Sequence, residues 1–210
     1  MNNVLPEERI AFNLDEFLIK YEYALHMLEA ELNILFHEYE RKNKYTPVEH
    51  VKSRIKSTHS IINKLIDKGY EITEENITNH IHDIAGVRIV CSFLDDVYDI
   101  VKIIEESNFI VIKKKKDYIK KPKETGYSSY HLIVEVPVFL SSGKIMVEAE
   151  IQIRTVAMDF WASLDHKIQY KFSTDIPSEV IEQMYQYSLE IKKMDKRMSK
   201  LNKMVNKYKK

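Results

Sequence analysis

The stretch Val147–Thr155, VEAEIQIRT, alternates apolar and polar residues without a break. Successive side chains of a β-strand point to opposite faces, so the stretch predicts a strand with one apolar and one polar face. Two interpretations of the polar face are open. It is either an ordinary solvated face, as is common in antiparallel sheets, or the lining of a cleft in which carboxylates hold a metal and a guanidinium meets phosphate. The polar residues are Glu148, Glu150, Gln152 and Arg154.

Other segments predict the strands that accompany this one. Residues 86–94, GVRIVCSFL, are rich in β-branched residues and have the character of a buried strand. Residues 109–116 predict a strand that runs into a basic loop. Residues 130–140 and 144–153 predict two strands joined by a hairpin turn at SSGK.

Helices are predicted before, between and after these strands. Apolar residues at helical spacing predict a helix over residues 13–42. Pro47 is placed in the first turn of a second helix that spans residues 48–68 and ends at Gly69. The order of elements predicts an α+β fold with a largely antiparallel sheet of four or five strands packed by helices. The remaining predicted helices cover residues 74–81, 95–107, 156–172 and the lysine-rich segment from Pro177.

Composition limits the class of protein. A chain of 210 residues, 44% hydrophobic and 30% charged, is typical of one globular domain with or without helical extensions. Its formal net charge is zero, so the overall charge indicates neither a nucleic-acid nor a membrane partner. No apolar run approaches the roughly 20 residues that span a bilayer. The N-terminus lacks the pattern of a secretory signal and Cys91 is the single cysteine, so a cytoplasmic location is expected.

Several common nucleotide and metal motifs are absent. The chain has no GxxxxGK[ST] phosphate loop, no GxGxxG, no HExxH and no paired CxxC. A Walker-type ATPase, a Rossmann dehydrogenase and a zinc finger are therefore disfavoured. What remains is a set of charged residues close to the predicted strands.

Two carboxylates are candidate metal ligands. Asp83 precedes the strand predicted at residues 86–94, and Glu150 lies at the centre of the opening strand. Mg²⁺ prefers one or two carboxylates together with phosphate and water oxygens, so Asp83 and Glu150 are the minimum needed to hold it against a nucleotide. The ordinary alternative for Asp83 is a turn or cap residue.

A basic segment follows the strand predicted at residues 109–116. It contains seven lysines between Lys113 and Lys123. Crowded lysines repel one another, so the segment is either a solvated loop or a phosphate site. Tyr127, beside Gly126, offers a flat ring suited to stacking on a base. On the helix predicted at residues 48–68, a further polar face is expected, for which solvent exposure is the alternative. Either Arg54, Ser57 and Ser60 or Lys56 and Ser60 lie three to four residues apart and so share that face.

Four segments together resemble the small alarmone synthetases, the single-domain members of the RelA/SpoT family. They are RIKSTHS (54–60), HDIAGVRIV (82–90), KKKDYIKKPKETGYSSYH (114–131) and VEAEIQIRTVAMDFWASLDHKIQYK (147–171). The resemblance implies the fold of the nucleotidyltransferase superfamily. It also implies transfer of pyrophosphate from ATP to the 3′-hydroxyl of GDP or GTP, with release of AMP. The expected organisation is an N-terminal helical extension (1–45), a synthetase domain (46–172) and a basic C-terminal helix (173–210).

The resemblance also implies roles for individual residues. On the ATP side, Arg54 and Arg88 would sandwich the adenine, while Lys56 and Ser60 would hold phosphates. Asp83 and Glu150 would bind Mg²⁺, and Glu150 would take the proton from the 3′-hydroxyl. Tyr127 would stack on guanine, and His131 with Lys123 would contact phosphate. The residues expected on the acceptor side are Lys114, Lys116, Lys123, Tyr127, His131, Gln152 and Arg154.

The resemblance also has implications for the partners of the protein, and the sequence departs from the family's pattern at two of the positions considered. The resemblance implies a homo-oligomer, a tetramer, and it implies no membrane. Lys114 replaces the arginine of the family's RxKD pattern, and Asp159 replaces an asparagine found in the branch that its own product activates. Nine lysines or arginines from Lys192 onward allow contact with RNA. Two alternatives follow, namely a toxic relative that pyrophosphorylates the 3′ end of tRNA and a non-catalytic RNA-binding module.

Overall fold

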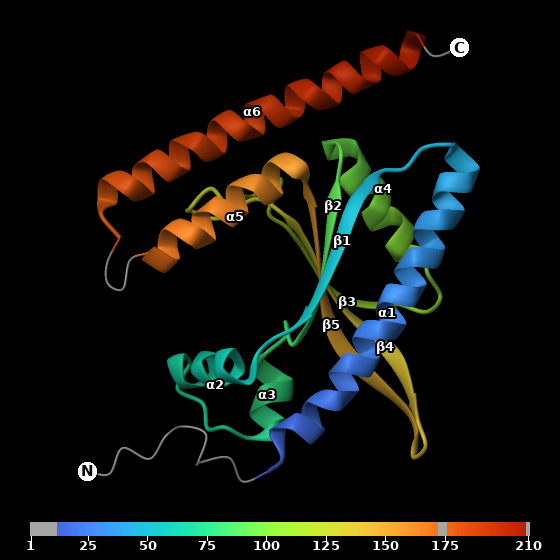
Figure 1. Ribbon diagram of the computed structural model, residues 1–210, viewed down its shortest axis with the longest axis vertical. Helices are drawn as coiled ribbons and strands as arrows, with labels where there is room; N and C mark the ends of the chain where they lie inside the picture. Colours follow the sequence, from blue (N-terminus) through green and yellow to red (C-terminus); the bar gives the residue numbers. More distant parts are fainter. Residues whose placement is uncertain (1–11, 172–175, 209–210) are drawn as a thin grey trace.

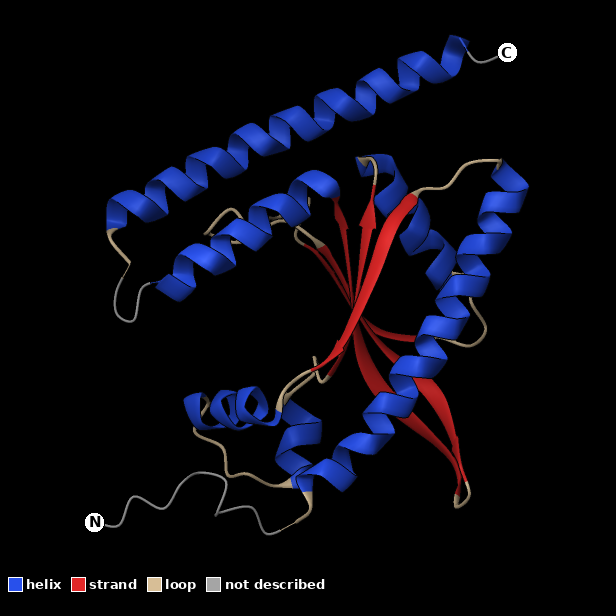
Figure 2. Ribbon diagram, viewed as in Figure 1, coloured by secondary structure: helices blue, strands red, loops and turns tan. Residues whose placement is uncertain are grey.

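A five-stranded sheet with the strand order β1-β2-β5-β4-β3 forms the centre of the structure (Figures 1 and 2). The structure is a computed structural model, and it describes residues 12–171 and 176–208. β2 and β5 run parallel and the other neighbours run antiparallel, which confirms the predicted α+β fold with a largely antiparallel sheet. The strands are β1 (Val48–Ile55), β2 (Ala85–Cys91), β3 (Val111–Asp117), β4 (Tyr130–Leu140) and β5 (Gly143–Thr155).

Helices cover the sheet unequally. α1 and α4 lie on one face, α2 and α5 lie on the opposite side, and α6 runs across one end of the sheet from α5 toward α4 (Figure 1). α1 packs against β4, β5, β1 and β2, while α6 packs on α5 and on the end of α4. No described helix is both long and apolar enough to cross a membrane. The helices are α1 (Leu14–Asn43), α2 (Thr58–Asp67), α3 (Glu74–His80), α4 (Leu94–Glu105), α5 (Val156–Lys171) and α6 (Ser178–Tyr208).

The apolar face of β5 forms the centre of the hydrophobic core. Ala149, Ile151 and Ile153 are fully buried there. They belong to the same core cluster as Leu28 and Leu32 of α1, so α1 is packed on the sheet rather than extended from it. The apolar half of the alternation in VEAEIQIRT therefore faces the core, and its polar half faces the other side of the sheet.

The helix predicted over residues 48–68 is wrong. Residues 48–55 form β1, an edge strand that pairs with β2 along its length, and only residues 58–67 are helical. Val48, Val51 and Ile55 recur at helical spacing, but they are the half-buried residues of a strand with a register shift near its start. Ser57 caps α2, because its hydroxyl accepts a hydrogen bond from the Ser60 amide. Arg54 and Ser60 consequently lie on different elements rather than on one helical face.

Polar contacts hold helix α6 against the end of β5 and the start of α4. Asp195 accepts a hydrogen bond of 2.7 Å from the Thr155 hydroxyl at the end of β5. The Ser199 hydroxyl accepts one of 3.0 Å from the Leu94 amide at the start of α4. α6 also lies directly on Gly126, where an added Cβ would collide with Ser188. Because Gly126 precedes Tyr127 and has a φ of +88°, glycine is required at this point both by space and by conformation.

Candidate active site

The strand register brings most of the predicted site residues onto one face of the sheet. Residues that pair directly across neighbouring strands point to the same side. One row across all five strands consists of Lys116, His131, Gln152, Arg88 and Lys52. The adjacent row consists of Lys114, Ile133, Glu150, Gly86 and Arg54.

A cavity of about 280 Å³ lies over this face where β1, β2 and β5 meet. It brings together the predicted carboxylates Asp83 and Glu150 and the predicted adenine-binding pair Arg54 and Arg88. These residues come from three separate segments of the sequence, and the fold makes the segments neighbours. Its full lining is Lys52, Ser53, Arg54, Asp83, Gly86, Val87, Arg88, Glu150 and Gln152.

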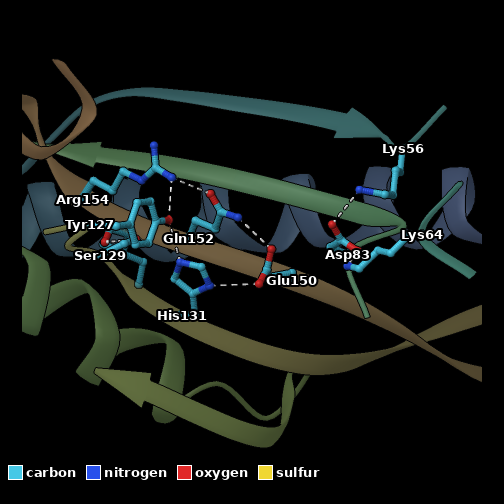
Figure 3. Close-up of polar contacts among 10 residues, drawn as sticks. Lys56, Lys64, Asp83, Tyr127, Ser129, His131, Glu150, Gln152 and Arg154 are labelled. Atoms are coloured by element: carbon cyan, nitrogen blue, oxygen red, sulfur yellow. Dashed lines mark hydrogen bonds and ion pairs between the residues drawn. The ribbon is translucent and has the colours of Figure 1, made fainter. Parts of the chain in front are cut away.

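Beside the cavity, five side chains form a closed ring of hydrogen bonds (Figure 3). Arg154 Nη2 donates to the Tyr127 hydroxyl (2.7 Å) and to Gln152 Oε1 (3.0 Å). Gln152 Nε2 donates to Glu150 Oε2 at 2.7 Å. His131 closes the ring, with Nε2 at 2.9 Å from the Tyr127 hydroxyl and Nδ1 at 2.9 Å from Glu150 Oε1. The predicted base is therefore linked through His131 to the predicted guanine-stacking residue.

The ring also indicates which groups donate. A guanidinium can only donate, so the Tyr127 oxygen accepts from Arg154 and directs its own proton toward His131 Nε2. A neutral His131 that accepts at Nε2 carries its proton on Nδ1 and donates it to Glu150. This assignment gives every member of the ring a compatible partner.

Glu150 is held in its ionised form. Burial raises the pKa of its carboxyl, but the hydrogen bonds from His131 and Gln152 outweigh burial, so the pKa lies below its ordinary value. The side chain is only 13% exposed and still charged at neutral pH. An ionised carboxylate in this position is suited to accept a proton from a substrate hydroxyl.

Substitution of His131 by phenylalanine is expected to raise the pKa of Glu150, because the variant removes the donor that stabilises the carboxylate. A lowered carboxyl pKa favours the native, ionised state above that pKa, and the benefit is lost as the pH falls through it. The acid side of the pH–rate profile should therefore shift to higher pH in the variant. Measuring AMP release from pH 4 to 8 checks this, with His82→Phe as the control, since His82 pairs with Glu148 instead. An unshifted acid limb would contradict the role given to His131.

Asp83 is held by two lysines from the segment that follows β1. Lys56 Nζ lies 3.0 Å and Lys64 Nζ 2.7 Å from its two carboxylate oxygens. Burial raises the pKa of Asp83, but the hydrogen bonds and charges of Lys64 and Lys56 outweigh burial and lower it overall. Lys64 was not predicted as a site residue. It lies one turn after Ser60 on α2, and that spacing is the signal that identifies it.

Asp83 and Glu150 fit a magnesium ion that arrives with a nucleotide. Both line the same cavity, and the charge of Asp83 acts on the Glu150 carboxyl. Among the described residues, no group of three or more His, Cys, Asp or Glu side chains could hold a metal ion. A protein cage is thus absent from the described part of the chain, whereas two carboxylates completed by phosphate and water oxygens are what Mg²⁺ commonly uses.

The remaining predicted residues lie around this centre. Lys123 Nζ is 5.0 Å from the centre of the Tyr127 ring, and Lys114 and Lys116 lie on β3 on the far side of His131. Ser60 lies in the exposed first turn of α2, where its hydroxyl is hydrogen-bonded to that of Ser57 at 2.8 Å. None of these side chains belongs to the hydrogen-bonded ring.

Two acidic residues near the ring have contacts that the sequence did not predict. Glu148 is paired with His82 at 2.6 Å, which leaves it outside the ring. Asp159, in the first turn of α5, makes ion pairs with Arg154 (3.1 Å) and with Arg88 (3.4 Å). Asp159 therefore joins a residue of the cavity to a residue of the ring.

Comparisons with known proteins agree with the fold. Residues 53–175 match the model described as the region found in RelA / SpoT proteins. The chain is 46% identical over 189 residues to GTP pyrophosphokinase YwaC of Bacillus subtilis, covering 90% of each chain. It is 35% identical to GTP pyrophosphokinase YjbM of the same organism, covering 89% of this chain and 87% of the relative.

Solved structures of small alarmone synthetases have the same fold as this chain. The crystal structure of small alarmone synthetase 1 from Bacillus subtilis bound to its product pppGpp has a TM-score of 0.84 at 35% identity, covering 91% of this chain and 97% of that one. Small alarmone synthetase 2 from Bacillus subtilis has a TM-score of 0.81 at 45% identity, covering 90% and 97%. Sequence and structure together show that the chain belongs to the RelA/SpoT family.

Proposed function

We propose that the protein is a (p)ppGpp synthetase that transfers pyrophosphate from ATP to the 3′-hydroxyl of GDP or GTP and releases AMP. The observation that carries the proposal is the ring in which ionised Glu150 is linked through His131 to Tyr127, directly beside the cavity with Arg54, Arg88 and Asp83. A donor site and an acceptor site thus share one base. The relatives named GTP pyrophosphokinase over most of the chain support this reaction.

The chemistry requires a base and positive charge. The 3′-oxygen of the acceptor attacks the β-phosphorus of ATP, the bond from that phosphorus to the oxygen that bridges to the α-phosphorus breaks, and AMP leaves with that oxygen. Glu150 takes the proton of the hydroxyl, a contribution of about 10²–10⁴-fold for general-base catalysis. Lys56 and Lys64, which hold Asp83, lie where they can neutralise phosphate charge.

Flat side chains orient the bases of the two nucleotides. Arg54 and Arg88 line the cavity and offer planar guanidinium groups to the adenine. Tyr127 offers its ring to guanine, with Lys123 near the same ring. Asp83 and Glu150 would hold Mg²⁺, which supplies positive charge to the phosphates when it is bound. A cytoplasmic location, where ATP and guanine nucleotides are available, agrees with this proposal.

The acceptor is tested by a comparison of substrates. The protein is incubated with ATP and Mg²⁺ together with GDP, GTP, GMP or uncharged tRNA, and AMP and the modified acceptor are measured. We expect AMP in equal amount to a guanine nucleotide that has gained a 3′-diphosphate. AMP release that depends on tRNA and on no guanine nucleotide would replace the proposal with the tRNA-modifying alternative. RNA binding without any binding of ATP would favour the non-catalytic module.

We further propose a homo-oligomer, a tetramer by resemblance to the small alarmone synthetases, in which copies meet along α6. Nine apolar residues of α6 recur at alternating intervals of four and three, the heptad spacing of helices that pair. Several of them are between 45% and 52% exposed in the single chain, which is unusual for a contiguous apolar stripe. The stripe consists of Val180, Met184, Tyr187, Ile191, Met194, Met198, Leu201, Val205 and Tyr208.

Glutamate at both Met198 and Leu201 is expected to lower the oligomeric state, because it places charge in the middle of the stripe. Light scattering after size-exclusion chromatography measures the mass of each species. The control variant carries glutamate at Lys193 and Lys200, which are exposed on another side of the same helix. An unchanged mass in the stripe variant, or a monomeric native protein, would contradict pairing along α6.

A further inference from the structure

We propose that Asp159 is a positioning residue that fixes Arg88, on the ATP side, relative to Arg154, on the acceptor side. The inference rests on the proposed function, because it assigns the two arginines to the two substrates. Asp159 is itself neither a lining residue of the cavity nor a member of the ring, so its contribution acts through the two guanidinium groups that it contacts.

One oxygen of Asp159 serves both arginines. Oδ1 lies 3.1 Å from Arg154 Nη1 and 3.4 Å from Arg88 Nη1. Arg88 and Arg154 come from β2 and β5, which are parallel neighbours in the sheet. Arg88 is paired with Gln152, and Arg154 follows Gln152 by two residues on the same face. Asp159 therefore bridges two charges that the sheet itself brings close together.

The bridge offsets repulsion between like charges. Arg154 is only 5% exposed and is buried beside Arg88. Burial and, after it, the charge of Arg154 lower the pKa of Arg88, while Asp159 acts in the opposite direction. Two guanidinium groups this close need an anion between them, or each will move away from the other.

The two guanidinium groups have few other contacts that fix their orientation. Nε of Arg88 and Nε of Arg154 are buried and have no hydrogen-bond partner among the described residues. Each group is thus oriented mainly through its terminal nitrogens, one of which faces Asp159. Without that carboxylate, Arg88 loses the ion pair that orients the plane it offers to adenine, and Arg154 is held, among the described residues, only by the bonds from Nη2 to Tyr127 and Gln152.

Asp159 is itself held firmly. It lies in the first turn of α5, where the partial positive charge of the helix terminus favours a carboxylate. The Thr155 hydroxyl accepts a hydrogen bond from the Met158 amide at 3.2 Å and donates one to Asp195 at 2.7 Å. α6 therefore anchors the turn that presents Asp159. A carboxylate held in this way can fix the positions of two flexible arginine side chains.

Asp159→Asn tests the inference, because asparagine keeps the shape and removes the charge. We expect the Kd of a non-hydrolysable ATP analogue and the KM of both substrates to rise about 10- to 100-fold, the equivalent of one charge-assisted hydrogen bond. Asp159→Glu restores the charge and should recover part of the loss. In a background of Arg88→Ala, Asp159→Asn should add little to the Kd of the ATP analogue, since the effect passes through Arg88.

The outcomes separate this inference from the proposed function. Glu190→Gln, an exposed acidic residue of α6, is the control and should leave the Kd unchanged. An Asp159→Asn protein that binds the analogue as tightly as the native protein overturns the inference. So does a variant with a lower melting temperature but an unchanged Kd and KM, since that result assigns Asp159 to stability alone. If native protein makes no AMP from ATP and GDP, the function fails, and the binding measurement still decides the role of Asp159.

Discussion

Glu150→Gln is expected to lower AMP release from ATP and GDP by about 10²–10⁴-fold, the usual contribution of a general base. The amide has nearly the shape of the carboxylate but cannot take a proton from the 3′-hydroxyl. It also offers one accepting oxygen where Glu150 accepts from both His131 and Gln152, so the ring keeps one of these two bonds. The protein should remain folded, and the loss should fall on kcat.

A matched control for this experiment lies on the same strand. Glu148 is two residues away on the same face of β5, but its carboxylate is paired with His82 and does not belong to the ring. Glu148→Gln should change AMP release by less than about threefold, within the range of ordinary surface substitutions. Equal losses in the two variants, or full activity in Glu150→Gln, would contradict the assignment of the base.

Asp83→Asn is expected to lower activity by at least about 10- to 100-fold, the effect of losing even an outer partner of a metal site. The variant removes a charge that both Lys56 and Lys64 contact, and it removes one of the two carboxylates proposed to hold Mg²⁺. The Mg²⁺ concentration needed for half-maximal activity should therefore rise as well.

A magnesium titration of AMP release measures this second effect. The control is Asp67→Asn, an exposed residue at the end of α2, which should leave the titration unchanged. Lower activity with an unchanged magnesium requirement would assign Asp83 to the orientation of the two lysines rather than to the metal.

The sequence predicted the elements whose patterns are strong. Strict alternation predicts β5 because a strand in mid-sheet must bury one face completely. Helical periodicity likewise predicts α1 and α4, whose apolar stripes face the core. The prediction for residues 48–55 was wrong because an edge strand buries little, so the few apolar residues of β1 show no alternation. The partner strand, β2, also lies about 30 residues later in the sequence.

The site residues were predicted individually, but their contacts were not. The link from Glu150 to His131 depends on the register of β4 against β5, and the ion pairs of Asp159 depend on where α5 begins. Neither quantity follows from spacing along the chain, since each is set by tertiary packing. Two features of the sequence do indicate local structure here. Lys64 lies one helical turn after Ser60, which places it near the same site, and Ser57 is a residue type that commonly caps the start of a helix.

The reaction itself is tested most directly by following both transferred phosphorus atoms. ATP carrying distinguishable labels on its β- and γ-phosphorus is incubated with GDP, Mg²⁺ and the protein, with Glu150→Gln in parallel. The account predicts that both labels move together onto the 3′ position of the guanine nucleotide, with one AMP formed for each product. Transfer of the γ-label alone with formation of ADP, or release of both labels as free pyrophosphate without a modified acceptor, would contradict it.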